Sequence, residues 1–262
     1  MQNKSPYNTM LQMTAPSLFD KKTGCIKLGM WSEDSLDHMM REAAYIEDAG
    51  EKIAFVSEQF LGVDYREFTL IGGPEKPEEF VINLEEVDCF TFVDYVEAVR
   101  LSLSFDEFKD NLKKVRYQSG VVDYVQRNHF FTDWIVFNKE FVEDVTGEVG
   151  GQKTKKTNKI LNVKEDGTYF LEGINPGERE ICFIPSKSVD DTVITRLRSG
   201  DYAGIYIEKE GLDVSHVGII IKKKDSTFLR HASSLESKRR VIDQDLNEYL
   251  TNKPGLLVLR AK

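Results

Sequence analysis

Cys89, His216 and His231 are the residues of this sequence whose types and spacing could support hydrolytic chemistry. Cys89 opens an amphipathic stretch, CFTFVDYVEAVRLS, and the two histidines follow in consecutive strand-like runs, VSHVGIII and STFLRHASS. A thiol is a strong nucleophile at neutral pH only where its thiolate is favoured, and a helix N-terminus and a neighbouring imidazolium both favour it. The pattern therefore predicts a cysteine hydrolase in which Cys89 is the nucleophile.

The histidine positions fit the two remaining roles in such a site. Strand alternation places the His216 ring opposite Val217 and Ile219. The same alternation puts Val214 and Gly218 on the His216 face, where the glycine leaves room for another chain or a ligand. A partner strand would bring the next histidine beside this ring, so that one imidazole acts as the base and the other fixes its tautomer.

Each of these residues also has a different explanation. Cys89 could be a small buried hydrophobe, and His216 and His231 could make hydrogen bonds that only stabilise core strands. A cysteine and two histidines are also legitimate zinc ligands, although the sequence has no CxxC or HxxxH pair and would draw each ligand from a separate element. A non-catalytic cell-envelope binding module that keeps the fold is a further alternative.

A helix that begins at Cys89 must position the nucleophile, and Asp88 is of the residue type that caps helix N-termini. Apolar side chains at three- or four-residue spacing predict its buried face: Phe92, Val96, Val99 and Leu103. The same period turns charged side chains to solvent: Asp94, Glu97 and Arg100.

Other elements frame this helix. Helices are predicted from Ser32 or Ser35 to Asp48, over Glu51–Phe60 and over Asp106–Tyr117, with a strand at EFVINLEE. A short helix over Ser188–Leu197 precedes strands at YAGIYIE, VSHVGIIIK and STFLRHA, and a helix near Asp243–Leu250 and a strand at LLVLR follow. A nucleophile helix followed by an antiparallel sheet predicts an α+β fold.

The 262 residues can bury a substantial core in one structural domain. We expect residues 1–80 to form an N-terminal arm and helices packed on a core at 81–262, with an insertion at about 118–185. Within the insertion, a hairpin is expected around Glu165-Asp166-Gly167, and the basic run Lys153–Lys159 is expected to be a mobile solvated loop.

Composition excludes several classes of function. A net charge of −9 and a pI near 5.1 disfavour a nucleic-acid partner, and no run approaches the roughly eighteen apolar residues of a membrane span. The first residues lack the pattern of a signal peptide. Three cysteines leave at least one free. Cys25, expected in a hairpin, and Cys182, expected in a buried strand, could still form a disulfide.

The motifs resemble a known family. VDCFTFV resembles the Asp-Cys helix motif, and SHVGII the His-strand motif, of the NlpC-type cell-wall cysteine peptidases, a bacterial superfamily with a papain-like fold. The order FLGVDY, FVINLEEVDCFTFV, NHFFTDW, SGDYAGIY, LDVSHVGIII and LRHASS is similar to its N-acetylmuramoyl-L-alanine amidase-like branch, over roughly residues 35–262.

This resemblance implies that Cys89 is the nucleophile, His216 the general base and His231 the orienting residue, with no cofactor or metal. The superfamily usually has Ser-Gly after its Asp-Cys pair, whereas Phe90-Thr91 stands here, so the pocket beside the nucleophile should differ. A tyrosine upstream of the cysteine commonly faces the site, and Tyr65 is the candidate, although it lies 24 residues before the cysteine.

The segment from Arg127 to Trp134 is the candidate for substrate recognition, because sugars bind through hydrogen bonds and through aromatic rings under their apolar faces. Arg127, Asp133 and Trp134 are the predicted contacts. The alternative is that Phe130, Phe131 and Trp134 belong to the core.

The predicted reaction is hydrolysis, through a thioester, of the bond between N-acetylmuramic acid and L-Ala in small peptidoglycan fragments. Cleavage between D-Glu and diaminopimelate, the typical superfamily reaction, stays open. We expect a monomer in the periplasm or cell envelope, with a leader absent from this numbering. If the reading frame starts at Met1, cytoplasmic recycling of muropeptides becomes the expectation.

Overall fold

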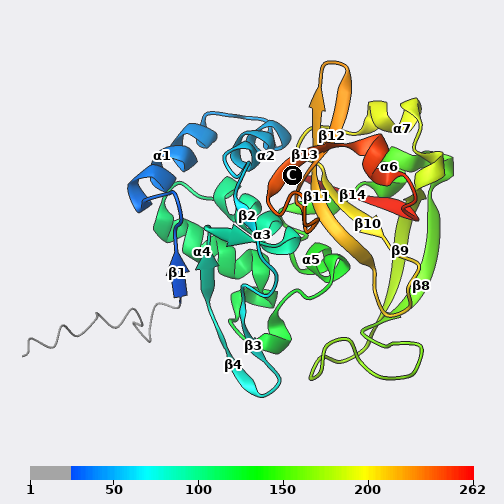
Figure 1. Ribbon diagram of the computed structural model, residues 1–262, viewed down its shortest axis with the longest axis horizontal. Helices are drawn as coiled ribbons and strands as arrows, with labels where there is room; N and C mark the ends of the chain where they lie inside the picture. The colour runs from blue at the N-terminus through cyan, green and yellow to red at the C-terminus, as the bar shows by residue number, and fades with distance from the viewer. Residues whose placement is uncertain (1–24) are drawn as a thin grey trace, which may run out of the picture.

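The computed structural model describes residues 25–262 (Figure 1). The helices are α1 (Glu33–Ala44), α2 (Ala49–Glu58), α3 (Cys89–Arg100), α4 (Phe105–Arg116), α5 (Phe131–Phe137), α6 (Thr146–Gly150), α7 (Asp191–Arg196) and α8 (Leu246–Leu250), with short 3-10 turns η1 (Gln118–Gly120), η2 (Tyr124–Gln126), η3 (Gly151–Lys153) and η4 (Ser186–Ser188). The strands are β1 (Cys25–Lys27), β2 (Asp64–Tyr65), β3 (Ile71–Gly73), β4 (Lys76–Glu79), β5 (Val81–Asn83), β6 (Glu86–Val87), β7 (Val142–Asp144), β8 (Lys155–Leu161), β9 (Gly177–Pro185), β10 (Tyr202–Tyr206), β11 (Val214–Lys223), β12 (Ser226–Ala232), β13 (Val241–Asp245) and β14 (Gly255–Ala261).

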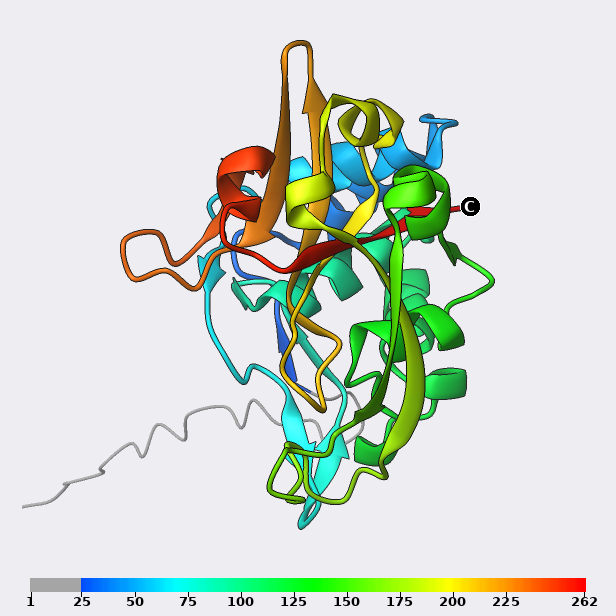
Figure 2. The same ribbon diagram turned by 90° about the vertical axis from the view of Figure 1, so that its right-hand side faces the viewer.

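A large antiparallel sheet organises the fold. Its eight strands follow the order β13-β12-β11-β10-β14-β9-β8, with β7 paired to β14. Helices α1 to α4 lie on one side of this sheet, and α6 and α7 lie on the other (Figures 1 and 2). The arrangement is a mixed α/β structure that agrees with the predicted α+β class.

Two hydrophobic cores fill the space on the two faces of the sheet. Alternation along β11 shows the division, since Ile219 and Ile221 pack in the core shared with the N-terminal helices. Ile220, between them, packs in the second core with side chains from α6, α7 and α8. The sheet therefore holds the predicted site strands between two helical layers.

The N-terminal helices begin where their caps predict. Ser32 caps α1 through a reciprocal pair of hydrogen bonds with Ser35, and Asp48 caps α2 by accepting from the Glu51 N–H at 2.8 Å. The second helix therefore starts at Ala49, slightly before the predicted residue.

The charged face predicted for α3 is wrong. Asp94 and Glu97 are almost completely buried, because the helix is enclosed by α2, α4 and the sheet. Arg116 pairs with Asp94 at 2.9 Å, and Arg100 pairs with Glu97 at 2.6 Å. Buried charges are tolerated when they are paired and hydrogen-bonded, so periodicity alone could not reveal this helix as a central one. Leu103, predicted as buried, is exposed.

The basic run was also predicted wrongly. Residues 155–161 form β8, which pairs with β9 along its whole length. Lys159 is buried, and its ammonium donates to the carbonyl oxygens of Ile207, Lys209 and Leu212 at 2.6 to 3.0 Å. This lysine fixes the loop before β11. The hairpin expected around Glu165-Asp166-Gly167 is reduced to a turn, with Gly167 donating to the Lys164 carbonyl and a single antiparallel bridge between Val163 and Tyr169.

The cysteines and the C-terminal segment show two further differences. Cys25 lies in β1, which pairs in parallel with β5 rather than within a hairpin, and the residues before Cys25 lie outside the described part. Cys25 and Cys182 are both free thiols, so the open disulfide alternative is not formed. The helix expected near Asp243 starts only at Leu246, because residues 241–245 form β13 against β12.

None of the helices described in residues 25–262 is long and apolar enough to span a membrane. The division at residue 80 and the insertion at 118–185 stay predictions.

Candidate active site

Cys89 is the first residue of α3, as predicted. The Asp88 carboxylate accepts from the backbone N–H of Phe90 at 2.9 Å and of Thr91 at 2.7 Å, and the Thr91 hydroxyl accepts from the Asp88 N–H at 3.0 Å. Thr91, which stands where the NlpC-type motif that this sequence resembles has glycine, therefore closes a capping box. This box fixes the backbone that carries the thiol.

The thiol lies against β11 at Val217, the residue after His216. The backbone N–H of Val217 hydrogen-bonds the Cys89 sulfur and lowers its pKa, as do the N–H groups of Cys89 and Phe90. Pairing of β11 with β12 begins only at Ile219 opposite Arg230, so the Val217 backbone is left outside that ladder. The start of α3 occupies the place where these two strands separate.

The two histidines meet as predicted. Nε2 of His216 lies 2.8 Å from Nδ1 of His231, and the rings are almost perpendicular, at 86°. His216 pairs with Ile205, whose side chain lies in the second core, so the ring faces away from Val217 and Ile219 as alternation predicts.

The prediction for Val214 is wrong. A register shift after the His216–Ile205 pair interrupts alternation, and Val214 packs with the first core instead of sharing the His216 face. β-Bulges of this kind re-aim side chains near functional sites, and a period-two pattern cannot anticipate them.

The electrostatics of the resting site differ from the predicted thiolate. Burial, with a smaller contribution from the Asp88 carboxylate, raises the pKa of the Cys89 thiol to about 12. Burial also lowers the pKa of His216 to about 3 and that of His231 to about 4. At neutral pH the thiol and both imidazoles are therefore neutral in the free site.

Tyr249 is a site residue that sequence reasoning missed. Its ring centroid lies 5.0 Å from that of His231 and 6.0 Å from that of His216, and Cys89 contributes to the rise of its pKa. The segment was predicted only as a terminal helix. No sequence signal marked this tyrosine, because its place depends on how α8 folds back over β12 and β13.

Tyr65 lies near the thiol, where the resemblance placed it. Strand β2 pairs in parallel with β6, which sets Tyr65 opposite Val87, two residues before Cys89. Burial raises the Tyr65 pKa to about 12, and Cys89 is among the groups that raise it. The guanidinium of Arg239 lies over the ring, at 5.2 Å.

The segment 127–134 does not offer its predicted contacts. Arg127 is bound to Glu78 of β4 through Nε at 3.0 Å and through a second, shorter bond, and the Tyr117 hydroxyl donates to the same carboxylate. Asp133 forms an ion pair with Arg179 of β9. The charged groups of Arg127 and Asp133 are therefore both engaged in contacts between secondary-structure elements.

Trp134 is completely buried, and Phe130 and Phe131 are buried with it. The indole N–H of Trp134 donates to Asp94 at 3.1 Å. An enclosed ring cannot stack on a sugar, so the predicted sugar contact of Trp134 is wrong and the alternative core placement holds.

The geometry does not suit a metal at the histidines. The two imidazole nitrogens that face each other are engaged in one hydrogen bond, whereas zinc ligands direct their lone pairs at the ion. Within residues 25–262, no group of three or more His, Cys, Asp or Glu side chains is arranged to hold a metal ion.

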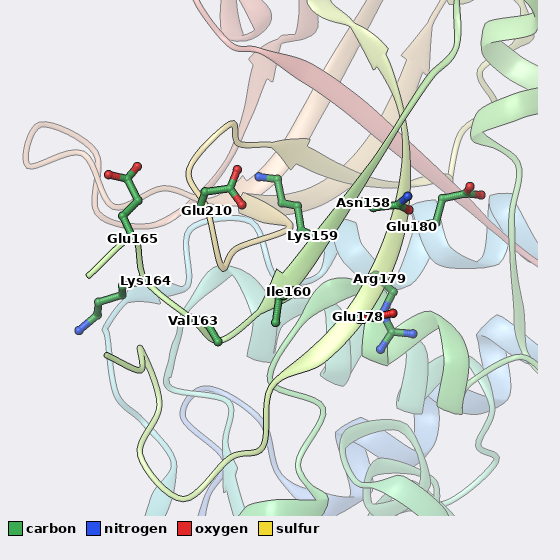
Figure 3. A pocket seen from close by; sticks show the side chains of 10 residues that line it. All are labelled: Asn158, Lys159, Ile160, Val163, Lys164, Glu165, Glu178, Arg179, Glu180 and Glu210. Carbon is green, nitrogen blue, oxygen red and sulfur yellow. The ribbon is translucent and has the colours of Figure 1, made fainter. Parts of the chain in front are cut away.

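A pocket of about 850 Å³ lies elsewhere, along β8, β9 and the adjoining loops (Figure 3). Lys159, Lys164, Glu178 and Glu210 are among its lining side chains. Neither Cys89 nor the histidines line this pocket. Its mixed charges carry no catalytic arrangement comparable to the cysteine–histidine cluster.

Comparison with solved structures finds close relatives. An N-acetylmuramoyl-L-alanine amidase from Bacteroides uniformis is 29% identical, with a TM-score of 0.69, over 82% of this chain and 99% of that one. A xylanase candidate from Bacteroides fragilis is 26% identical, with a TM-score of 0.65, over 78% and 98%. A Legionella pneumophila protein, 21% identical with a TM-score of 0.74 over 87% and 94%, shares the fold.

No curated protein matches the sequence. The family model described as N-acetylmuramoyl-L-alanine amidase-like matches residues 55–256, which include Cys89, His216 and His231. This match spans most of the chain, and the chain therefore belongs to the N-acetylmuramoyl-L-alanine amidase-like family.

Proposed function

We propose that the protein is a cysteine amidase that hydrolyses the bond between N-acetylmuramic acid and L-Ala in peptidoglycan fragments. Family membership supports an amidase-like function on peptidoglycan. The observation that carries the cysteine mechanism is the 2.8 Å contact between His216 and His231, together with a thiol at a helix N-terminus that hydrogen-bonds the backbone of Val217, the residue after His216. A histidine that only stabilised the core would not require a second imidazole at hydrogen-bond distance.

The proposed mechanism starts from the neutral pair. As the Cys89 sulfur attacks the carbonyl carbon, its S–H bond breaks and the proton moves to Nδ1 of His216, because Nε2 is engaged with His231. The imidazolium exists only while negative charge develops on the substrate. The raised pKa of Cys89 and the lowered pKa of His216 both keep these groups neutral in the free enzyme. The proton is therefore transferred only during the attack on the substrate.

The oxyanion would be stabilised by the N–H of Cys89 at the start of α3 and by the Tyr65 hydroxyl. His216 then gives its proton to the amine of L-Ala as the C–N bond breaks, leaving a thioester on Cys89. Water, deprotonated by His216, cleaves the thioester to the muramoyl carboxylic acid and the free thiol. The sum of the steps is the addition of one water molecule across one amide bond.

We also propose that the protein belongs to the NlpC-type superfamily. A nucleophile helix packed against an antiparallel sheet that carries the two histidines supports an NlpC-type, papain-like core. We also propose that the protein acts as a monomer in the cell envelope, where such fragments arise.

The xylanase candidate among the relatives suggests glycoside hydrolysis as another possibility. Glycosidases use a pair of carboxyl groups on either side of the scissile bond. Here Asp88, the carboxylate next to the nucleophile, is occupied by capping bonds to Phe90 and Thr91. The groups that meet at this site are a thiol and imidazoles, which suit acyl transfer.

A matched pair of cysteine variants tests the mechanism. Cys89→Ala should abolish hydrolysis of a disaccharide-peptide, whereas Cys182→Ala, which removes a thiol from β9, should retain it. A chelator should leave the wild type active. Loss of activity in chelator that zinc restores, or an active Cys89→Ala protein, would contradict the proposal.

A further inference from the structure

Two buried polar side-chain atoms next to the site lack a hydrogen-bond partner in the described part of the chain. Within residues 25–262, Nε2 of His231 and Oε1 of Gln244 are both buried, and neither has a hydrogen-bond partner. Leaving such a group unpaired costs roughly 1–3 kcal/mol, so two of them together call for an explanation.

The strand register places these two residues on the same face of the sheet. In the β12–β13 ladder, His231 is opposite Ile242 and Leu229 is opposite Gln244. Positions two apart on a strand share a face, so Gln244 is the diagonal neighbour of His231, within reach of a long side chain. In agreement with this placement, the Gln244 side chain is among the groups that raise the pKa of His231, against the larger lowering caused by burial.

An amide oxygen can only accept a hydrogen bond. When it faces Nε2 of His231, that nitrogen must carry the proton, and Nδ1 is left as an acceptor. The Nε2–H of His216 then donates to this Nδ1, since the two nitrogens lie 2.8 Å apart. Nδ1 of His216 is left with its lone pair, which is the form that can take the Cys89 proton.

We propose that Gln244 is a positioning residue that fixes the tautomer of His231 and, through it, that of His216. This role rests on the proposed cysteine mechanism. The chain of groups would be thiol, imidazole, imidazole and amide, so the site is oriented by a neutral side chain instead of a carboxylate. A neutral acceptor fixes the proton positions without drawing a second proton into the site.

The charged groups that act on His231 set the background for a test. Lys238, before β13, and Lys253, after α8, oppose protonation of the ring, whereas Asp243 of β13 favours it. A carboxylate at position 244 would add to the effect of Asp243. Gln244→Glu should therefore keep an acceptor facing Nε2 and raise the pKa of His231, while Gln244→Leu removes the acceptor at similar size.

Nitrogen-15 NMR of histidine-labelled protein reads these tautomers directly, because the chain has only four histidines. We expect His231 and His216 of the wild type both to carry their proton on Nε2. Gln244→Leu should give mixed tautomers of His231, and Gln244→Glu should restore the Nε2–H form with a raised pKa. Gln118→Leu, the same change on η1, is the control and should match the wild type.

If Gln244 has only a structural role, Gln244→Leu and Gln244→Glu should change the spectra in the same way, or neither variant should change them. Either result would overturn the proposal. A proton on Nδ1 of His231 in the wild type would overturn it even if no variant folds. These measurements need no substrate, so they are independent of whether the amidase activity is found. Given activity, Gln244→Leu should lower kcat about tenfold or more at unchanged KM.

Discussion

Gly218 lies so close to His231 that a Cβ atom at position 218 would stand 3.0 Å from the Cβ of His231. The same added atom would lie 2.8 Å from the carbonyl oxygen of Arg230, which cannot give way without moving β12. The space left beside His216, which the sequence suggested for a chain or ligand, is therefore filled by the neighbouring strand. This close approach lets the two imidazoles meet.

Gly218→Ala should separate β11 from β12 and break the contact between the histidines. We expect a loss of about 1–3 kcal/mol in the free energy of unfolding, as for other overpacked sites, and at least a roughly tenfold fall in kcat. Gly177→Ala is the matched control, because a Cβ at that strand position meets no atom within 4 Å. Denaturant unfolding and steady-state kinetics measure both effects. Wild-type kcat in Gly218→Ala would contradict the account.

Asp88→Asn removes the negative charge beside Cys89 while keeping a side chain that can cap α3. Asparagine caps helices as well as aspartate does, so the stability should change little. The carboxylate raises the Cys89 pKa, and its removal should therefore lower that pKa and speed alkylation by iodoacetamide at a given pH between about 7 and 10. Cys182, farther along the chain in β9, is the internal control for reagent reactivity. An unchanged or slower Cys89 reaction would show that Asp88 does not act on the thiol.

Stability should fall in mild acid because the paired histidines are held neutral. The unfolded chain protonates histidine with a pKa near about 6.5, whereas in the folded protein the pKa is about 3 for His216 and about 4 for His231. Between these values the unfolded state binds more protons, so this contribution is complete above pH ~6.5 and is lost toward pH ~3 to 4.

Denaturant unfolding at pH 7.5 and pH 5 measures this difference. His231→Gln should make the loss of stability smaller, because one of the groups is removed. His38→Gln, at an exposed position of α1, should leave the loss unchanged. Equal pH dependence in all three proteins would contradict neutral, buried histidines at the site.

Trp134→Phe tests the corrected role of this residue. The smaller ring leaves a cavity and strands the Asp94 oxygen that the indole N–H contacts, so we expect a loss of about 1–3 kcal/mol in stability. The folded variant should keep the wild-type KM for a disaccharide-peptide. A rise in KM for sugar-bearing substrates at unchanged stability would instead restore the original prediction of a sugar contact.

Local patterns predicted the positions of Cys89, His216 and His231 in the fold well. The positions of Asp88, Cys89 and the two histidines follow from a helix N-terminus and from two adjacent antiparallel strands. Residues close in the sequence determine both of these features. Periodicity then indicated which face His216 takes. The α+β class followed from the order of these elements.

The errors arose where distant residues decide the environment. The sequence pattern placed Asp94 and Glu97 on the solvent side, but other elements bring Arg116 to Asp94 and the Tyr202 hydroxyl to Glu97. The lysines of β8 looked like a loop because a strand pattern with charged side chains on its exposed face carries little hydrophobic signal.

Gln244 and Tyr249 were missed for a related reason. The segment that carries them alternates weakly and was assigned to one helix, but it divides into β13 and α8 at the Asp245 cap. Only the pairing of β13 with β12 places Gln244 diagonally from His231. No local pattern specifies such a diagonal.

Mass analysis of the products formed from a purified disaccharide-tetrapeptide tests the central claim most directly. The wild type should release the intact disaccharide, ending in the free muramoyl carboxyl group, together with the intact tetrapeptide, and Cys89→Ala should release neither. A product that retains the disaccharide on L-Ala-D-Glu would show cleavage inside the stem peptide and contradict the proposed amidase.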